Sequence, residues 1–460
     1  MKKKIIKFLF ILAINYFIFL LLNSIKLSNW SLSGDDLYSL SNKIPSIQSY
    51  ILMSLSQFTG QYRHFTYLFF SLYDNLIPNF YLIFLLHGLL FSLIPTITYF
   101  LIDKKIPIIL KLFLVSPIFF SPIFYYDNYT ISSLANILIS IITLILLYYY
   151  KNRKKLNSTK YSLIFLILVL LSFTIKETFI VPLSIYCLVQ LLLTTKKNYS
   201  KLMYICISGL LFLVYFYKRS SGYQSNVPSD YFFVFDIKNS INNLGNMIAW
   251  IINYPRGWQY GAPVRYPIQK IISGIYLTFV LISYYLSFIK NKLEFFSINF
   301  FLFSSMILFV FLNNVHLFYM DLPFLFLLQL VVISTEYLYS KNIKFAYIFV
   351  GLWFLINLSN QFIIKEQWLE YSFVANSNKS AVNYLNILKE NEFEKYDLIC
   401  ISEQNRGGFG TEDGRLVNHL GLKNFKVIST KDKLLPIECN SNNSLNLVND
   451  AWDYQLYSQD

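Results

Sequence analysis

Charged side chains are scarce in this sequence, and their scarcity excludes most classes of soluble protein. Asp, Glu, Lys and Arg make up 14% of the 460 residues, whereas 55% are hydrophobic. Soluble domains carry about a quarter charged residues, so the composition is that of an integral membrane protein. The net charge of +14 comes from short basic clusters between apolar stretches. Because these clusters form no basic stripe on a soluble face, we do not expect nucleic-acid binding.

Motifs of soluble enzymes and of metal sites are also lacking. The sequence contains no HExxH, GxSxG, Walker-type or Rossmann motif, so hydrolase and nucleotide-driven chemistry have no support. The four cysteines show no CxxC or metal-ligand spacing. Cys187 and Cys206 lie in apolar stretches and are expected to be small apolar fillers. Cys400 and Cys439 lie in the tail, where the sequence leaves their pairing open.

Long apolar stretches are what the chain has in abundance. A helix crosses the hydrocarbon core in about 20 residues, and many stretches reach or approach this length. No small-x-small cleavage site precedes Asn23, so we expect an uncleaved first helix. We predict about eleven transmembrane helices. Their expected positions are 5–23, 79–101, 107–125, 131–150, 161–175, 178–194, 202–217, 271–289, 295–312, 322–339 and 345–362.

The positive-inside rule orients these spans. With the N-terminus in the cytoplasm, the Lys-rich connectors, including the run 151–160, fall on the cytoplasmic side. An odd number of spans then places the C-terminus outside. We therefore expect a multi-pass protein of the cell membrane, inner or plasma, whose functional polar residues face the non-cytoplasmic side.

The expected fold is an all-α polytopic membrane domain, residues 1–362, followed by a small extracytoplasmic α/β domain, residues 363–460. Two long external loops, 24–78 and 218–270, interrupt the membrane domain. Apolar and amphipathic segments at 50–55, 65–72 and 241–252 predict interfacial helices within these loops.

In the tail, the spacing of apolar residues predicts a helix over Ser380–Glu394. Strands are predicted over Tyr396–Ser402 and Phe425–Ser429. The last 20 residues, 441–460, are expected to be weakly ordered.

Two adjacent carboxylates, Asp35 and Asp36, follow the first span by about a dozen residues. Such a pair at a membrane surface can supply a catalytic base, a metal ligand or both, although Gly-Asp-Asp is also ordinary turn chemistry. If a divalent metal ion is bound, Asp35 or Asp36 is its expected ligand.

A second pair, Lys176 and Glu177, interrupts a long apolar stretch. A charge at the bilayer centre costs about 2.5–3.5 kcal/mol, so two short spans that meet at the outer surface are more favourable. This hairpin would hold a cation and a carboxylate at the level of lipid headgroups, or it is a simple helix turn.

Further polar residues lie in the predicted external segments. An Arg at the membrane surface can bind phosphate through its planar guanidinium or can anchor the headgroup region. The candidates for such phosphate binding are Arg63 and Arg256. Other candidates for substrate contacts are Gln61, His64, Trp258, Tyr260, His316 and Tyr319.

The order of these features resembles the GT-C glycosyltransferases, specifically the bacterial proteins akin to protein O-mannosyltransferases and glycosyltransferase-39-like proteins. The resemblance covers about residues 1–340. It consists of the external acidic pair Asp35-Asp36, the Gly60–Arg63 segment, the hairpin carrying Lys176-Glu177 before Pro182, and the late segment with His316, Tyr319 and Pro323. Several relatives have Arg-Pro-Leu where this chain has Arg63-His64-Phe65.

The resemblance implies an inverting transfer of a sugar from a polyprenyl-phosphate donor to an extracytoplasmic glycan, lipid or protein acceptor. Asp35 would be the base, assisted by Asp36. Lys176 and Arg63 would lie near the donor phosphate, and Glu177 near the sugar or acceptor. Two alternatives stay open. One is a polysaccharide polymerase or ligase, which the arginines of loop 218–270 favour. The other is a transporter or flippase of lipid-linked saccharides.

Overall fold

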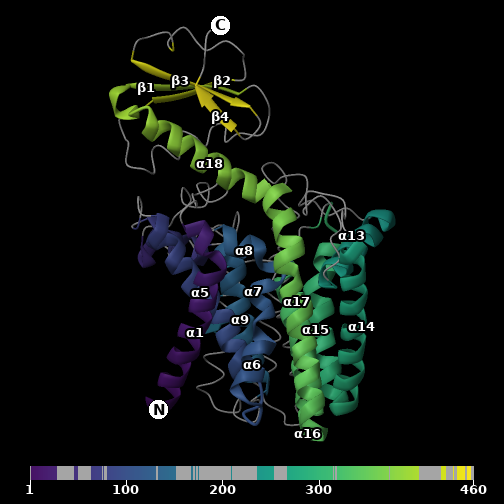
Figure 1. Cartoon of the computed structure of the whole chain (residues 1–460). Coiled ribbons are helices and arrows are strands. Elements are labelled where there is room, and N and C mark those ends of the chain that lie inside the picture. The colour runs from purple at the N-terminus through teal and green to yellow at the C-terminus, as the bar shows by residue number, and fades with distance from the viewer. Residues whose placement is uncertain are drawn as a thin grey trace.

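The computed structural model describes a helical bundle with a small sheet at one end (Figure 1). The N-terminus lies at the end of the bundle opposite the sheet. The described residues are 2–27, 46–49, 64–74, 76, 80–130, 133–151, 167–168, 171, 175, 209, 236–252, 267–313, 315, 319–371, 373–403, 426–430, 439, 443–450 and 453–456.

Four helices in this part of the chain are long and apolar enough to cross a membrane. They belong to α1 (Lys2–Leu27), α5 (Phe80–Leu101), α14 (Pro267–Lys290) and α16 (Asp321–Lys341). Each contains an apolar segment of 21 residues, which spans about 32 Å at 1.5 Å per residue. This length matches the hydrocarbon core of a bilayer.

Three other predicted spans in the described part correspond to the helices α9 (Leu134–Lys151), α15 (Lys292–Val310) and α17 (Ile343–Tyr371). The span expected over 107–125 is found in part, as the apolar helix Ile108–Phe120. Its hydrogen bonding divides it into α6 (Ile108–Val115) and α7 (Pro117–Phe120), and the 3-10 turn η1 (Pro122–Phe124) follows. Prolines begin the second and third pieces, because a proline ring lacks the N–H that a continuous helix would need. The spans predicted over 161–217 fall almost wholly outside the described residues.

Helix α16 forms the centre of the bundle. It packs against α14, α15 and α17, and 72% of its apolar segment is buried. Helix α1 lies at the periphery, where only 17% of its segment is buried. It contacts α5 at Gly88, where a Cβ atom would clash with the ring of Phe19. The exposed aliphatic and aromatic side chains of α1, α14 and α15 form the outer surface of the bundle.

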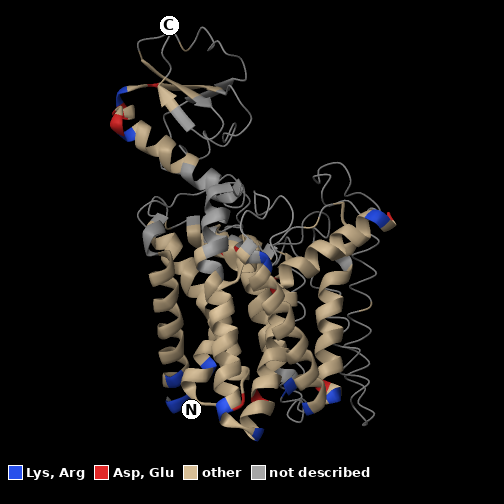
Figure 2. Cartoon of the chain, turned by 45° about the vertical axis from the view of Figure 1, so that its right-hand side comes forward, with Lys and Arg blue, Asp and Glu red and all other residues tan. Residues whose placement is uncertain are grey.

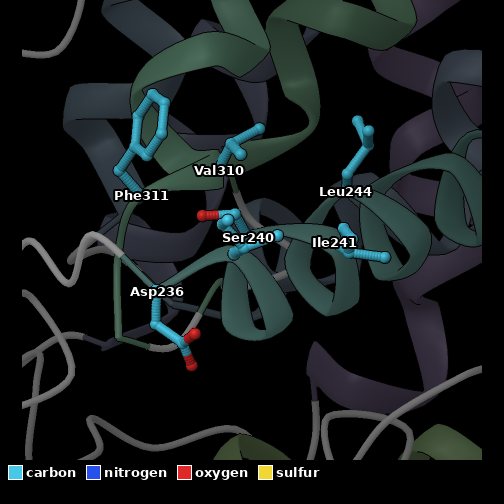
Figure 3. Close-up of a pocket in the computed structure, with 7 residues that line it drawn as sticks. Asp236, Ser240, Ile241, Leu244, Val310 and Phe311 are labelled. Atoms are coloured by element: carbon cyan, nitrogen blue, oxygen red, sulfur yellow. The ribbon is translucent and has the colours of Figure 1, made fainter.

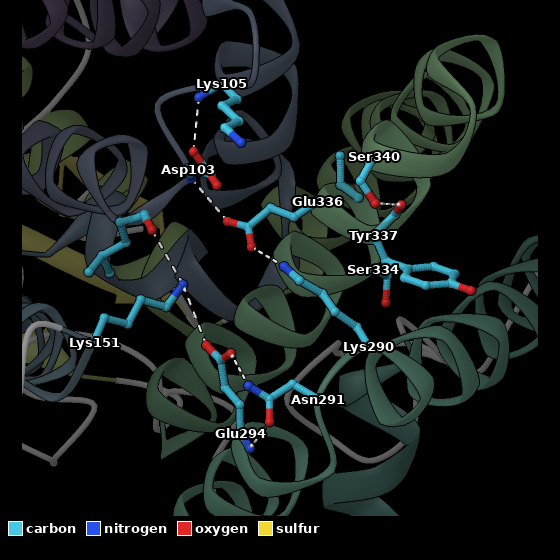
Figure 4. Close-up of polar contacts among 12 residues, drawn as sticks. Asp103, Lys105, Lys151, Lys290, Asn291, Glu294, Ser334, Glu336, Tyr337 and Ser340 are labelled. Carbon is cyan, nitrogen blue, oxygen red and sulfur yellow. Dashed lines mark hydrogen bonds and ion pairs between the residues drawn. The ribbon is translucent and has the colours of Figure 1, made fainter.

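Most of the described Lys and Arg residues gather at the end of the bundle that carries the N-terminus (Figure 2). Here Lys290 forms an ion pair with Glu336, whose Oε1 also accepts the backbone N–H of Asp103 at 2.9 Å (Figure 4). Lys151 lies 4.0 Å from Glu294 and donates to a backbone carbonyl at the end of α5, 3.3 Å away. These contacts join the ends of α5, α9, α14, α15 and α16 at one level.

At the opposite end, α17 leads into α18 (Phe373–Glu390), which carries the tail domain (Figure 1). A four-stranded sheet has the order β2-β1-β3-β4. Its strands are β1 (Leu398–Glu403), β2 (Lys426–Thr430), β3 (Ser444–Asp450) and β4 (Asp453–Leu456). The first three are parallel, and β4 is antiparallel to β3.

Two of these strands, β3 and β4, lie within residues 441–460, for which the sequence predicted weak order. Strand β3 pairs with the central strand β1 over six residue positions and buries Leu445 and Leu447, which explains its order. A disulfide joins Cys400, in the middle of β1, to Cys439, and the two Cα atoms lie 6.0 Å apart. The question of their pairing, which the sequence left open, is answered by this bond.

Candidate functional site

Most residues that the sequence singles out for chemistry lie outside the described part of the chain. These are Asp35, Asp36, Gln61, Arg63, Lys176, Glu177, Arg256, Trp258, Tyr260 and His316. The described residues next to them therefore define the candidate site. They show which elements are in contact beside these positions in the chain.

Two of the candidates can be placed. His64 is the first residue of α4 (His64–Asp74), the helix predicted from the apolar segment 65–72. Tyr319 lies just before α16 and is 7% exposed. Its ring stacks on Phe309 near the end of α15, with centroids 4.3 Å apart and planes inclined by 11°. Tyr319 is thus part of the junction between α15 and α16, at the end of the bundle that carries the tail domain.

One hydrogen bond joins the neighbours of two predicted site segments. Thr66, in the first turn of α4, donates through Oγ1 to the backbone carbonyl of Ile175 at 3.4 Å. Both residues are buried. Thr66 follows Arg63 by three residues, and Ile175 immediately precedes Lys176. Helix α4, which begins just after Arg63, is therefore in contact with the residue that precedes Lys176.

Helix α4 also takes part in a second set of hydrogen bonds, in which a histidine inside an apolar helix joins three elements. His87 lies on α5, about 10 Å along the axis from its first residue. Its Nε2 is 2.6 Å from the backbone carbonyl of Asp127 on α8 (Tyr125–Tyr129), and its Nδ1 is 3.3 Å from the hydroxyl of Tyr73 on α4. Because a carbonyl only accepts, Nε2 carries the proton, and in the neutral ring Nδ1 accepts from the tyrosine.

The Asp127 carboxylate belongs to the same buried cluster. Its Oδ1 accepts from the side-chain amide of Asn136 on α9 at 3.1 Å. Ser133 donates to the carbonyl oxygens of Thr130, at 2.8 Å, and of Asp127, at 3.4 Å. All of these side chains are buried. The cluster therefore fixes α4, α5, α8 and α9 relative to one another.

Sequence reasoning missed His87, although a signal was present. An ionisable residue inside a transmembrane segment is costly and is a functional-site hypothesis in its own right. Nothing in the sequence assigns Asp127 to the site, because an isolated Asp near a span end has many structural uses. Its role emerges only from the partners Asn136 and His87, which are distant in the chain or lie inside other spans.

The cluster can hold the ends of these helices in a fixed arrangement and can supply a carboxylate in a water-poor environment. No group of three His, Cys, Asp or Glu residues suited to a metal ion occurs among the residues whose placement is described. Comparisons of the chain with protein-family models, with characterised proteins and with solved structures give no significant match.

Proposed function

We propose that this chain is an integral membrane glycosyltransferase of the GT-C type. It moves a sugar from a polyprenyl-phosphate donor to an extracytoplasmic acceptor, in the assembly or modification of cell-envelope glycans. The donor is proposed to bind where the first external loop and the Lys176-Glu177 hairpin meet. The observation that carries the proposal is the hydrogen bond between Thr66 and Ile175, which joins the flanks of these two segments.

The orientation of the chain is part of the proposal, and two features support it. Basic residues gather at the end of the bundle with the N-terminus, as expected for the cytoplasmic side (Figure 2). The tail domain at the other end contains the Cys400–Cys439 disulfide. Disulfides persist in oxidising compartments, so an extracytoplasmic tail fits this bond. The proposed site then lies in the outer leaflet, where lipid-linked donors present their phosphate.

In the proposed reaction, Asp35 removes the proton from an acceptor hydroxyl. The resulting oxygen attacks the anomeric carbon from the face opposite the phosphate, and the bond from that carbon to the phosphate oxygen breaks with inversion. Lys176 and Arg63 stabilise the negative charge of the departing polyprenyl phosphate. Asp36 orients the acceptor or a divalent metal ion, and Glu177 contacts the sugar.

The test compares Asp35→Asn and Asp36→Asn with Asp74→Asn in the native host, read out by mass spectrometry of envelope glycans. Asp74 ends α4 and is a matched control, because it is an acid of the same external loop without an assigned role. We expect a glycan to lose one sugar in at least one of the first two variants and to be intact in the third. Unchanged glycans in both stably expressed site variants would refute the enzyme assignment.

One observation favours the alternative of a transporter. Gln329, in the middle of α16, is completely buried, and neither its amide nitrogen nor its oxygen has a hydrogen-bond partner within the described structure. A polar group of this kind in a bundle core is expected on a substrate path. A transporter would lose function in Gln329→Leu and keep it in Asp35→Asn, the reverse of what the proposed enzyme would show.

A further inference from the structure

The second external loop contains a helix whose apolar side chains are left uncovered. Helix α13 (Ile237–Ile251) begins at Asp236, whose carboxylate accepts the backbone N–H of Lys238 at 3.1 Å. Ile237, Ile241 and Ile248 are 79%, 66% and 48% exposed. Their spacing places them on one face of the helix. Such a face is costly in water and is the mark of a helix that lies in a membrane interface.

The other face of α13 is fastened to the end of α15. Asn243 donates through its side-chain amide to the carbonyl oxygens of Val310, at 3.2 Å, and Leu312, at 2.6 Å. Asn239 donates to the same Leu312 carbonyl at 2.8 Å. The carbonyls at and just beyond the end of α15 are thereby satisfied by α13, which holds α13 at a fixed place at the end of the bundle (Figure 1).

Between α13 and the end of α15 lies an open cavity of about 380 Å³ (Figure 3). Ile237, Ile241 and Leu244 line it from α13, and Val310 and Phe311 line it from the α15 side. Asp236 and Ser240 are the polar residues at its wall. The cavity is therefore suited to a hydrocarbon group with a polar end.

The cavity continues an apolar track along the surface of α15. Phe303 and Ile307 on this helix are 59% and 51% exposed. Phe311 follows Ile307 by four residues, so the track leads to the cavity wall. Since α14 and α15 expose apolar side chains along the bundle, lipid chains cover this surface in a membrane. The same lipid layer is continuous with the mouth of the cavity.

We propose that the cavity binds one acyl chain of a phospholipid from the leaflet at the tail-domain end, with α13 lying in the membrane interface above it. The chain would run along the α15 track and enter beneath Ile241. Asp236 and Lys238 are exposed at the start of α13 and present one negative and one positive charge. This arrangement complements a zwitterionic headgroup, whose amine and phosphate carry the opposite charges. The proposal does not depend on the glycosyltransferase assignment.

The test uses an environment-sensitive fluorophore on single cysteines in the full chain, reconstituted in nanodiscs of phosphatidylethanolamine and phosphatidylglycerol. Cys187→Ala and Cys206→Ala provide the background, since Cys400 and Cys439 are joined in a disulfide. The test site is Ile241→Cys. Phe303→Cys is the control in contact with lipid chains, and Lys238→Cys is the control at the polar start of α13. At each of the three positions, the quenching of the fluorophore is measured with lipids spin-labelled on the acyl chain and with aqueous iodide.

We expect the label at position 241 to behave like the label at position 303. Quenching by the acyl-chain spin label should be about twofold or more stronger at 241 than at 238, and iodide should quench the label at 241 only weakly. Iodide quenching at 241 equal to that at 238 would overturn the proposal, because the face would then be in water. Protection from both quenchers would also overturn it, since protein would then cover the cavity. Undecaprenyl phosphate is added last at low mole fraction. Loss of acyl-chain quenching at 241 alone would show that an isoprenoid, not a phospholipid, is the preferred occupant.

Discussion

Replacing His87 by Phe tests the buried cluster most directly. The phenyl ring fills a similar volume but can neither donate to the Asp127 carbonyl, 2.6 Å from Nε2, nor accept from the Tyr73 hydroxyl, 3.3 Å from Nδ1. Both partners are buried. The substitution therefore removes two hydrogen bonds and leaves their partners in a region without bulk water.

The expected cost follows from these two bonds. A typical hydrogen bond contributes about 0.5–1.5 kcal/mol net, and a buried group that loses its partner costs about 1–3 kcal/mol. The Asp127 carbonyl retains a long contact with Ser133, at 3.4 Å, which places its penalty at the low end. We expect the free energy of unfolding to fall by about 2–4 kcal/mol, above the roughly 0.6 kcal/mol average for a single hydrogen bond between membrane helices.

The assay is steric-trap unfolding in bicelles, applied to wild type, His87→Phe, His87→Gln and Tyr73→Phe. His87→Gln should recover part of the loss, because its amide can still donate toward Asp127. Tyr73→Phe should cost less than His87→Phe, and it should cost less in the His87→Phe background than in wild type, because the shared bond is already absent there. A His87→Phe protein as stable as wild type, or fully additive effects of the two changes, would refute this network.

Three further predictions concern other buried or paired groups. Gln329→Met should leave the melting temperature unchanged or raise it, because it removes two unpaired buried polar atoms. A clear loss of stability would mean that the amide has a bound partner. The double substitution Cys400→Ser and Cys439→Ser should make the tail domain more susceptible to protease, because removal of the disulfide lowers the free energy of unfolding by about 2–4 kcal/mol. Protease resistance equal to that of wild type would contradict a structural role of the bond. Glu336→Ala should lower the free energy of unfolding by about 1–3 kcal/mol, and Glu336→Gln should lower it less, because Gln still accepts from the Asp103 N–H. Equal effects of the two substitutions in thermal unfolding would contradict that hydrogen bond.

The sequence predicted the helices best where apolar composition and length act together. The helices α1, α5, α14 and α16 end within a few residues of the predicted spans, because polar connectors bound a run that is long enough for the bilayer. Hydropathy alone did not predict the division of 107–125, where Pro117 and Pro122 begin new helical pieces inside a continuous apolar run. The strands after Asn443 were also missed, since short strands of mixed polarity depend on pairing with β1 rather than on their own pattern.

The site was less accessible to sequence reasoning, because its polar groups find their partners across long separations. Thr66 bonds to Ile175, 109 residues away, and His87 bonds to Asp127, 40 residues away. Nothing local in the chain indicates either pairing. The acidic pair Asp35-Asp36 and the pair Lys176-Glu177 stay predictions, since they lie outside the described residues.

Helix α17 is longer than a membrane is thick, and this length has a mechanical consequence. Its 29 residues extend over about 44 Å, while the hydrocarbon core is about 30 Å. Its apolar part ends at Ser359, and about three further helical turns follow before it ends at Tyr371. The position and orientation of the tail sheet thus depend on the length of these last turns of α17. Inserting a single residue into those turns would rotate the sheet by about 100° around the axis of α17 and shift it by about 1.5 Å along that axis.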